Sequence, residues 1–116
     1  PRPRSFAKRI NKKVERLALR RSFTDRLSTG DVILVDDFQV SEPKTKLLVS
    51  ILNDLQVGED VLILVDEYTE NLALAARNLP TVNLVRASSV NTYLMLLYKK
   101  IVITQAGLEA LGRRLV

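Results

Sequence analysis

The sequence predicts an α/β domain, a three-layer sandwich in which helices cover both faces of a mostly parallel four-stranded sheet. Two observations lead to this prediction. Short apolar runs alternate along the chain with segments of helical periodicity. These runs are apolar at every position, which is typical of strands that are covered on both faces. A basic N-terminal arm and helix precede the body of the domain.

The N-terminal part is predicted to consist of an extended basic arm over residues 1–10 and a basic helix over 11–26. Pro1 and Pro3 favour the extended arm, and Asn11 is expected to be the N-cap of the helix. On a helical wheel, apolar residues and basic residues occupy different sectors. The sector expected to pack on the body contains Ile10, Val14, Leu17 and Ala18. The basic sector contains Arg9, Lys12, Lys13, Arg16 and Arg20.

The α/β body is predicted to occupy residues 27–116, within a single domain of 1–116. Its strands are expected at 32–36, 61–65, 82–86 and 100–104. A helix is expected to begin near Pro43 and to end at Gly58. Thr69 and Thr104 are predicted to cap two further helices. The segment 90–98 is ambiguous in composition and is assigned as a helix because it lies between two strands.

The composition excludes several classes of function. The chain contains no Cys and no His. Disulfides, thiolate chemistry, the usual zinc ligands and histidine-based catalysis are therefore absent. No apolar run approaches the roughly 20 residues that span a bilayer. We therefore expect no enzymatic activity, no cofactor or metal, and no membrane partner.

Positive charge is concentrated at the N-terminal end. Residues 1–26 hold ten of the 18 Lys and Arg residues and two acids, a net +8, whereas 27–116 hold eight bases and eleven acids, a net −3. Arginine, which binds phosphate through two nitrogens, supplies seven of the ten bases. Phe6 and Phe23 are the only aromatic residues nearby, too few for a platform that stacks single-stranded bases. The pattern favours binding to the phosphates of a structured RNA.

Carboxylates that follow two predicted strands suggest a different class of function. Asp36 and Asp37 follow the first strand, and Asp66 and Glu67 follow the second. Ligand sites of open α/β sheets lie at the carboxyl ends of strands, so these acids could hold Mg²⁺ in a metal-binding or phospho-accepting signalling domain. Thr104 or Lys100 would then assist. The simpler interpretation is that they cap turns and helix N-termini.

Four segments resemble the L-four family of bacterial-type large-subunit ribosomal proteins: INKKVERLALRRS, VDDFQVSEPKTKLL, ENLALAARNLPTV and VNTYLMLLYKKIVIT. They occur in the family's order and with its spacing. One departure is NTYLMLL, where the family form carries an acid. The resemblance implies that the chain is the C-terminal portion of such a protein. The family's N-terminal segment and long basic loop would precede Pro1.

The resemblance also implies function, partners and site residues. It implies a structural constituent of the large ribosomal subunit that binds large-subunit ribosomal RNA, supports subunit assembly and translation, and contacts neighbouring large-subunit proteins. The protein would be a monomer within a ribosome of the cytoplasm or of an organelle. The implied RNA-binding residues near the N-terminus are Arg2, Arg4, Lys8, Arg9, Asn11, Lys12, Lys13, Arg16, Arg20 and Arg21. Those in the body are Lys44, Thr45, Lys46, Asn71, Arg77 and Asn78.

Overall fold

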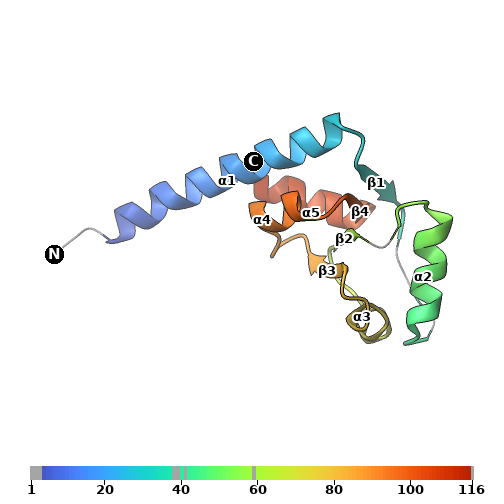
Figure 1. Ribbon diagram of the computed structural model, residues 1–116. Helices are drawn as coiled ribbons and strands as arrows, with labels where there is room; N and C mark the ends of the chain where they lie inside the picture. The colour runs from blue at the N-terminus through green and yellow to red at the C-terminus, as the bar shows by residue number, and fades with distance from the viewer. Residues whose placement is uncertain (1–3, 38–39, 41, 59, 116) are drawn as a thin grey trace.

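The computed structural model describes residues 4–37, 40, 42–58 and 60–115, with side chains from Lys12 onward. A long helix, α1 (Arg4–Ser28), leads into an alternation of strands and helices (Figure 1). The strands are β1 (Val32–Val35), β2 (Val61–Val65), β3 (Val82–Arg86) and β4 (Lys100–Thr104). The other helices are α2 (Thr45–Asp54), α3 (Glu70–Arg77), α4 (Thr92–Leu97) and α5 (Gln105–Leu115).

The four strands form one fully parallel sheet in the order β1-β4-β2-β3. The α/β class and the four predicted strands are confirmed. The central strands β2 and β4 are almost completely buried, as their uniformly apolar sequences indicate. The edge strands are more open, and the side chain of Leu34 in β1 is 53% exposed.

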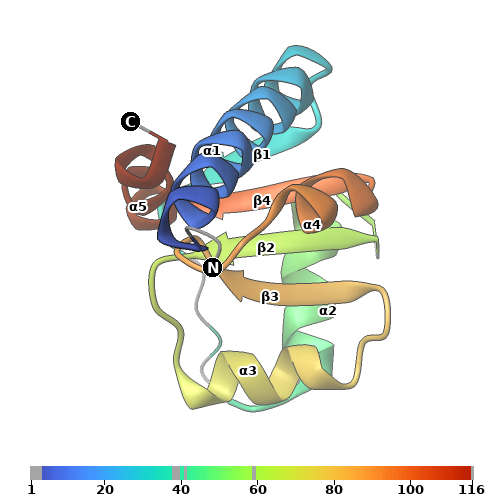
Figure 2. The ribbon, with the colours of Figure 1, turned by 90° about the vertical axis from the view of Figure 1, so that its left-hand side faces the viewer.

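Helices cover both faces of this sheet, which confirms the three-layer sandwich (Figure 2). Successive side chains of a strand point to opposite faces. Val61, Ile63 and Val65 of β2 pack with the apolar residues of α2 and α3. Leu62 and Leu64 of the same strand pack with residues of α1, α4 and α5. Each face of the sheet therefore has its own apolar core.

Side-chain caps fix the starts of three of the shorter helices. The hydroxyl of Thr69 accepts a hydrogen bond from Leu72 N at 3.3 Å, and that of Thr104 accepts one from Gly107 N at 3.0 Å. These two predicted caps are confirmed. Asn91 caps α4 in the same way, accepting from Leu94 N at 2.8 Å. The assignment of a helix between β3 and β4 is also confirmed.

The N-terminal helix differs from its prediction in extent. Residues 4–10, expected as an extended arm, are the first turns of α1, and Asn11 lies inside the helix instead of capping it. A proline restricts mainly the residue that precedes it, and no proline follows Pro3 in this segment. Residues 1–3 lie outside the described residues. No helix in the described parts of the chain, α1 included, is long and apolar enough to cross a membrane.

The face by which α1 packs on the body also differs from its prediction. Leu19, Ser22 and Phe23 are buried, whereas Val14 and Leu17 are 58% and 63% exposed. The buried Ser22 hydroxyl donates to the Leu19 carbonyl at 2.9 Å, so this face carries no unpaired hydroxyl. Among the α1 residues with described side chains, Leu19 and Phe23 contribute to the apolar core, while the N-terminal end of the helix extends away from the sheet (Figure 1). Val14, Leu17 and Ala18 of the expected apolar sector therefore face outward.

Candidate nucleic-acid interface

The exposed side of α1 carries the basic residues that the sequence singles out. Because Leu19 and Phe23 face the core, Lys13, Arg16 and Arg20 project from the flank of the helix. Arg21 lies farther round, on the outer face with Val14 and Leu17. All of the predicted bases of α1 with described side chains are exposed: Lys12, Lys13, Arg16, Arg20 and Arg21. Among the described residues none of them forms an ion pair.

The remaining predicted residues at this end lie at the start of α1. Arg4, Lys8, Arg9 and Asn11 lie in its first turns, and Arg2 lies outside the described residues. The predicted basic residues from Arg4 onward therefore belong to one helix of 25 residues.

Arg26, by contrast, is held within the fold. Its Nη2 donates to the carbonyl oxygens of Tyr98 and, at 2.7 Å, Lys99. Its Nη1 lies 3.4 Å from Asp31, which also pairs with Lys100 at 3.2 Å. The hydroxyl of Thr29, which donates to Asp31 at 2.9 Å, and the ammonium group of Lys100 lower the pKa of this carboxyl. This cluster joins the end of α1 to the start of the sheet and removes Arg26 from the exposed bases.

The predicted RNA-facing residues of the body lie on the other side of the molecule. Lys44 and Lys46 stand at the start of α2, and Lys44 pairs with Glu42 at 3.2 Å. Thr45 is the first residue of α2. In α3, Asn71 is half-buried, Arg77 is exposed, and Asn78 is the C-cap. Since α2 and α3 cover the face of the sheet opposite α1, the structure does not bring the two groups together.

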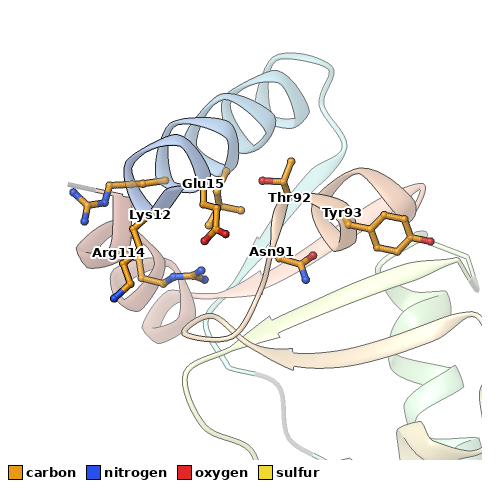
Figure 3. A pocket seen from close by; sticks show the side chains of 8 residues that line it. Lys12, Glu15, Asn91, Thr92, Tyr93 and Arg114 are labelled. Atoms are coloured by element: carbon orange, nitrogen blue, oxygen red, sulfur yellow. The ribbon is translucent and has the colours of Figure 1, made fainter. Parts of the chain in front are cut away.

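A pocket of about 490 Å³ lies where α1 meets the start of α4 and the end of α5 (Figure 3). From α1 it is lined by Lys12, Glu15, Arg16 and Leu19. Asn91, Thr92, Tyr93 and Arg114 line the other side. Sequence reasoning identified Lys12 and Arg16 but missed the other polar residues. No local sequence signal marks Arg114, since only the fold brings it beside α1.

Among the described residues, the carboxylates that follow β1 are not gathered with those that follow β2. Within the described parts of the chain, no group of three or more acidic side chains is placed to hold a metal ion. The strand order explains this, because β4 lies between β1 and β2 and separates Asp36 and Asp37 from Asp66. The suggested helpers have other roles. Thr104 caps α5, and Lys100 pairs with Asp31 at the opposite end of the strands. The signalling alternative is not supported.

The fold and the charged helix define an α/β domain with a basic α-helical extension. Comparison with known families then identifies the group: the chain belongs to the ribosomal protein L4/L1 family, which it matches over residues 1–114. The resemblance seen in the four sequence segments is thereby confirmed.

Individual relatives agree with this assignment. The chain is 38% identical to large ribosomal subunit protein uL4 of Acholeplasma laidlawii over 109 residues, which cover 94% of this chain and 53% of the relative. It is 41% identical to uL4 of Porphyromonas gingivalis over 113 residues, covering 97% of this chain and 54% of the relative. The chain thus spans about half the length of these relatives.

Proposed function

We propose that this chain is the RNA-binding C-terminal portion of a structural constituent of the large ribosomal subunit. In this proposal the chain binds large-subunit ribosomal RNA, contacts neighbouring large-subunit proteins, and supports assembly and translation without catalysing a reaction. It acts as a monomer in a ribosome of the cytoplasm or of an organelle. Its membership of the ribosomal protein L4/L1 family supports this role.

One observation carries the RNA-binding part of the proposal. Nine of the ten bases of residues 1–26, a segment of net charge +8, lie in α1, and its exposed bases have no ion-pair partner among the described residues. A cation without a partner retains its full attraction for phosphate, and each neutralised phosphate releases counterions. The interface therefore runs along α1. Lys44, Lys46 and Arg77 on the opposite face supply at most a second, smaller contact.

Substitution of bases that lie outside the pocket tests this interface. Lys13, Arg20 and Arg21 replaced together by Glu should sharply weaken binding to bacterial large-subunit ribosomal RNA. The slope of log affinity against log salt should flatten by about one unit for each phosphate that is no longer neutralised. All three side chains are exposed, so the circular dichroism spectrum and the thermal midpoint should stay near those of the unchanged protein.

A variant with the same change of charge on the other face provides the control. Lys44, Lys46 and Arg77 replaced together by Glu should weaken binding much less, because they are spread over two elements and Lys44 already pairs with Glu42. Equal losses of affinity in the two triple variants would contradict an interface along α1. Unchanged affinity and slope in the α1 variant would reject the proposal.

A further inference from the structure

The pocket between α1, α4 and α5 combines positively charged side chains with one acid. Lys12 and Arg16 are exposed and form no ion pair among the described residues. Arg114 is held in place, because its Nη1 donates to the carbonyl oxygens of Ala87 and Val90 at 2.8 and 2.7 Å. The carboxylate of Glu15 points into the space that Arg114 also enters (Figure 3). The pocket thus presents three bases and one acid.

A lone anion would not use all of these groups. Three bases against one acid favour a negatively charged ligand, but Glu15 would repel a simple phosphate. A carboxylate is useful where a ligand presents hydrogen-bond donors. Within the described residues Glu15 pairs with neither Lys12 nor Arg114, so it remains free to accept hydrogen bonds. The charges suit a ligand with an anionic end and an N–H donor end.

A nucleotide of RNA has both ends. Its phosphate is anionic, and adenine, cytosine and guanine carry exocyclic amino groups, whereas uracil carries none. The pocket's volume of about 490 Å³ lies within the usual range for small-molecule sites. The fixed guanidinium plane of Arg114 offers a surface of the kind on which unstacked RNA bases lie. Asn91 uses its oxygen to cap α4, which leaves its amide nitrogen to donate.

We propose that this pocket accepts one unstacked nucleotide of RNA, with its phosphate on Lys12 and Arg16 and the amino group of its base on Glu15. The proposal rests on the proposed function, because this nucleotide belongs to the RNA that α1 binds. Tyr93 does not close the pocket, since its ring points away from Lys12 and Arg114 (Figure 3) and is 70% exposed. The nucleotide enters from the open side, as a base extruded from a strand that passes along α1.

Titration of the isotopically labelled 116-residue chain with four nucleoside 5′-monophosphates tests base recognition. Saturable amide shifts should appear at residues 15–19 and 91–93 with AMP, CMP and GMP. UMP and inorganic phosphate should bind roughly tenfold more weakly, the usual effect of losing a hydrogen bond to a charged group. Equal binding of phosphate and all four nucleotides would show an anion site only and overturn the proposal.

The Glu15→Gln variant separates simple attraction of anions from recognition of the base, because the two predict opposite changes in the affinity for AMP, CMP and GMP. If the pocket only attracts anions, removal of a negative charge tightens the binding of every nucleotide. If Glu15 accepts from the base, AMP, CMP and GMP lose affinity because the neutral amide oxygen of glutamine accepts more weakly than a carboxylate, whereas UMP gains because glutamine can also donate. Uniform tightening would reject base recognition.

Lys12→Gln and Lys13→Gln form a matched pair. Both residues are exposed, adjacent lysines of α1, but only Lys12 lines the pocket. Monophosphate binding should fall severalfold in Lys12→Gln and stay unchanged in Lys13→Gln. An equal loss of monophosphate affinity in both variants would contradict binding of the phosphate in the pocket. RNA binding could depend on Lys13, Arg20 and Arg21 while the pocket binds all four nucleotides and phosphate equally. In that case the proposed function stands and only the inference of a nucleotide site fails.

Discussion

At the scale of single residues, Gly107 lies close against the backbone of the sheet. A Cβ atom at this position would lie 2.9 Å from the carbonyl oxygen of Leu64 and 3.2 Å from the Cα of Val65. Both are backbone atoms of β2 in the buried core, so neither can move aside cheaply. The Gly107 amide also donates to the hydroxyl of Thr104 at the start of α5. Glycine is therefore required here for helix–sheet packing.

Gly112 in the same helix provides a direct comparison. A Cβ at Gly112 would meet nothing within 4 Å. Gly107→Ala should lower the free energy of unfolding by about 1–3 kcal/mol, the usual cost of overpacking. Gly112→Ala should leave it unchanged or raise it by up to about 1 kcal/mol, because alanine favours the helix. Urea unfolding measures both variants, and equal changes would contradict the proposed close approach.

At the scale of elements, α1 shows how helical periodicity can indicate the wrong face. The helix has two apolar sectors, one containing Val14 and Leu17 and the other containing Leu19 and Phe23. The first has more apolar members, so the sequence favours it. The fold selects the second because Arg26, on the same side as Leu19 and Phe23, bonds to the chain between α4 and β4. A contact between residues so distant in sequence leaves no local pattern.

Two leucines of α1 test this orientation with the same substitution. Leu19 is 3% exposed and Leu17 is 63% exposed. Leu19→Ala should lower the free energy of unfolding by about 2–5 kcal/mol through the cavity it leaves. Leu17→Ala should change it by about 0.5 kcal/mol or less, as is usual at the surface. Thermal or urea unfolding measures the change in the free energy of unfolding for each variant. A larger effect for Leu17 would mean that α1 packs by the face predicted from sequence.

Elements whose signals are local were predicted well. The bounds of β2, β3 and β4 coincide with the predicted apolar runs, and Thr69 and Thr104 cap the helices they were expected to cap. Each of these features depends on residues that are adjacent or three positions apart. The start of α1 differs from the prediction because a proline restricts mainly the residue before it, so Pro1 and Pro3 do not hold residues 4–10 in an extended conformation. The pocket could not be predicted, since Lys12, Asn91 and Arg114 meet only through the packing of three helices.

At the scale of the whole molecule, the strand order decides which residues act together. The order β1-β4-β2-β3 separates the carboxylates that follow β1 from those that follow β2. It also places α2 and α3 on the face opposite α1, so the RNA-facing residues predicted from the family fall on two sides. The sequence indicates the strands but not their order, which depends on crossovers between distant segments. The sequence could therefore group the basic residues of α1, but it could not indicate that the bases of α2 and α3 lie on the opposite face.

The charge of α1 also governs how copies of the chain meet. Val14 and Leu17 form an exposed apolar stripe on α1. The sequence predicts that these two side chains pack on the body of the domain. Two side chains supply far less than the roughly 800 Å² that each partner of a stable complex buries. Arg21 lies among them, with Lys13 and Arg20 beside them, and a symmetric dimer through this stripe would bring like charges together.

We therefore expect the RNA-free chain to sediment as a monomer at about 0.15 M salt, where charges within about 8 Å still repel. Any weak association should strengthen as salt rises, because screening removes the repulsion and leaves the apolar contact. Sedimentation velocity across a salt series measures this dependence. Arg21→Gln should shift association to lower salt, whereas Arg77→Gln, in α3 on the opposite face of the sheet, should not. A tight dimer at moderate salt would show that the interface between the copies buries a larger apolar area than Val14 and Leu17 supply.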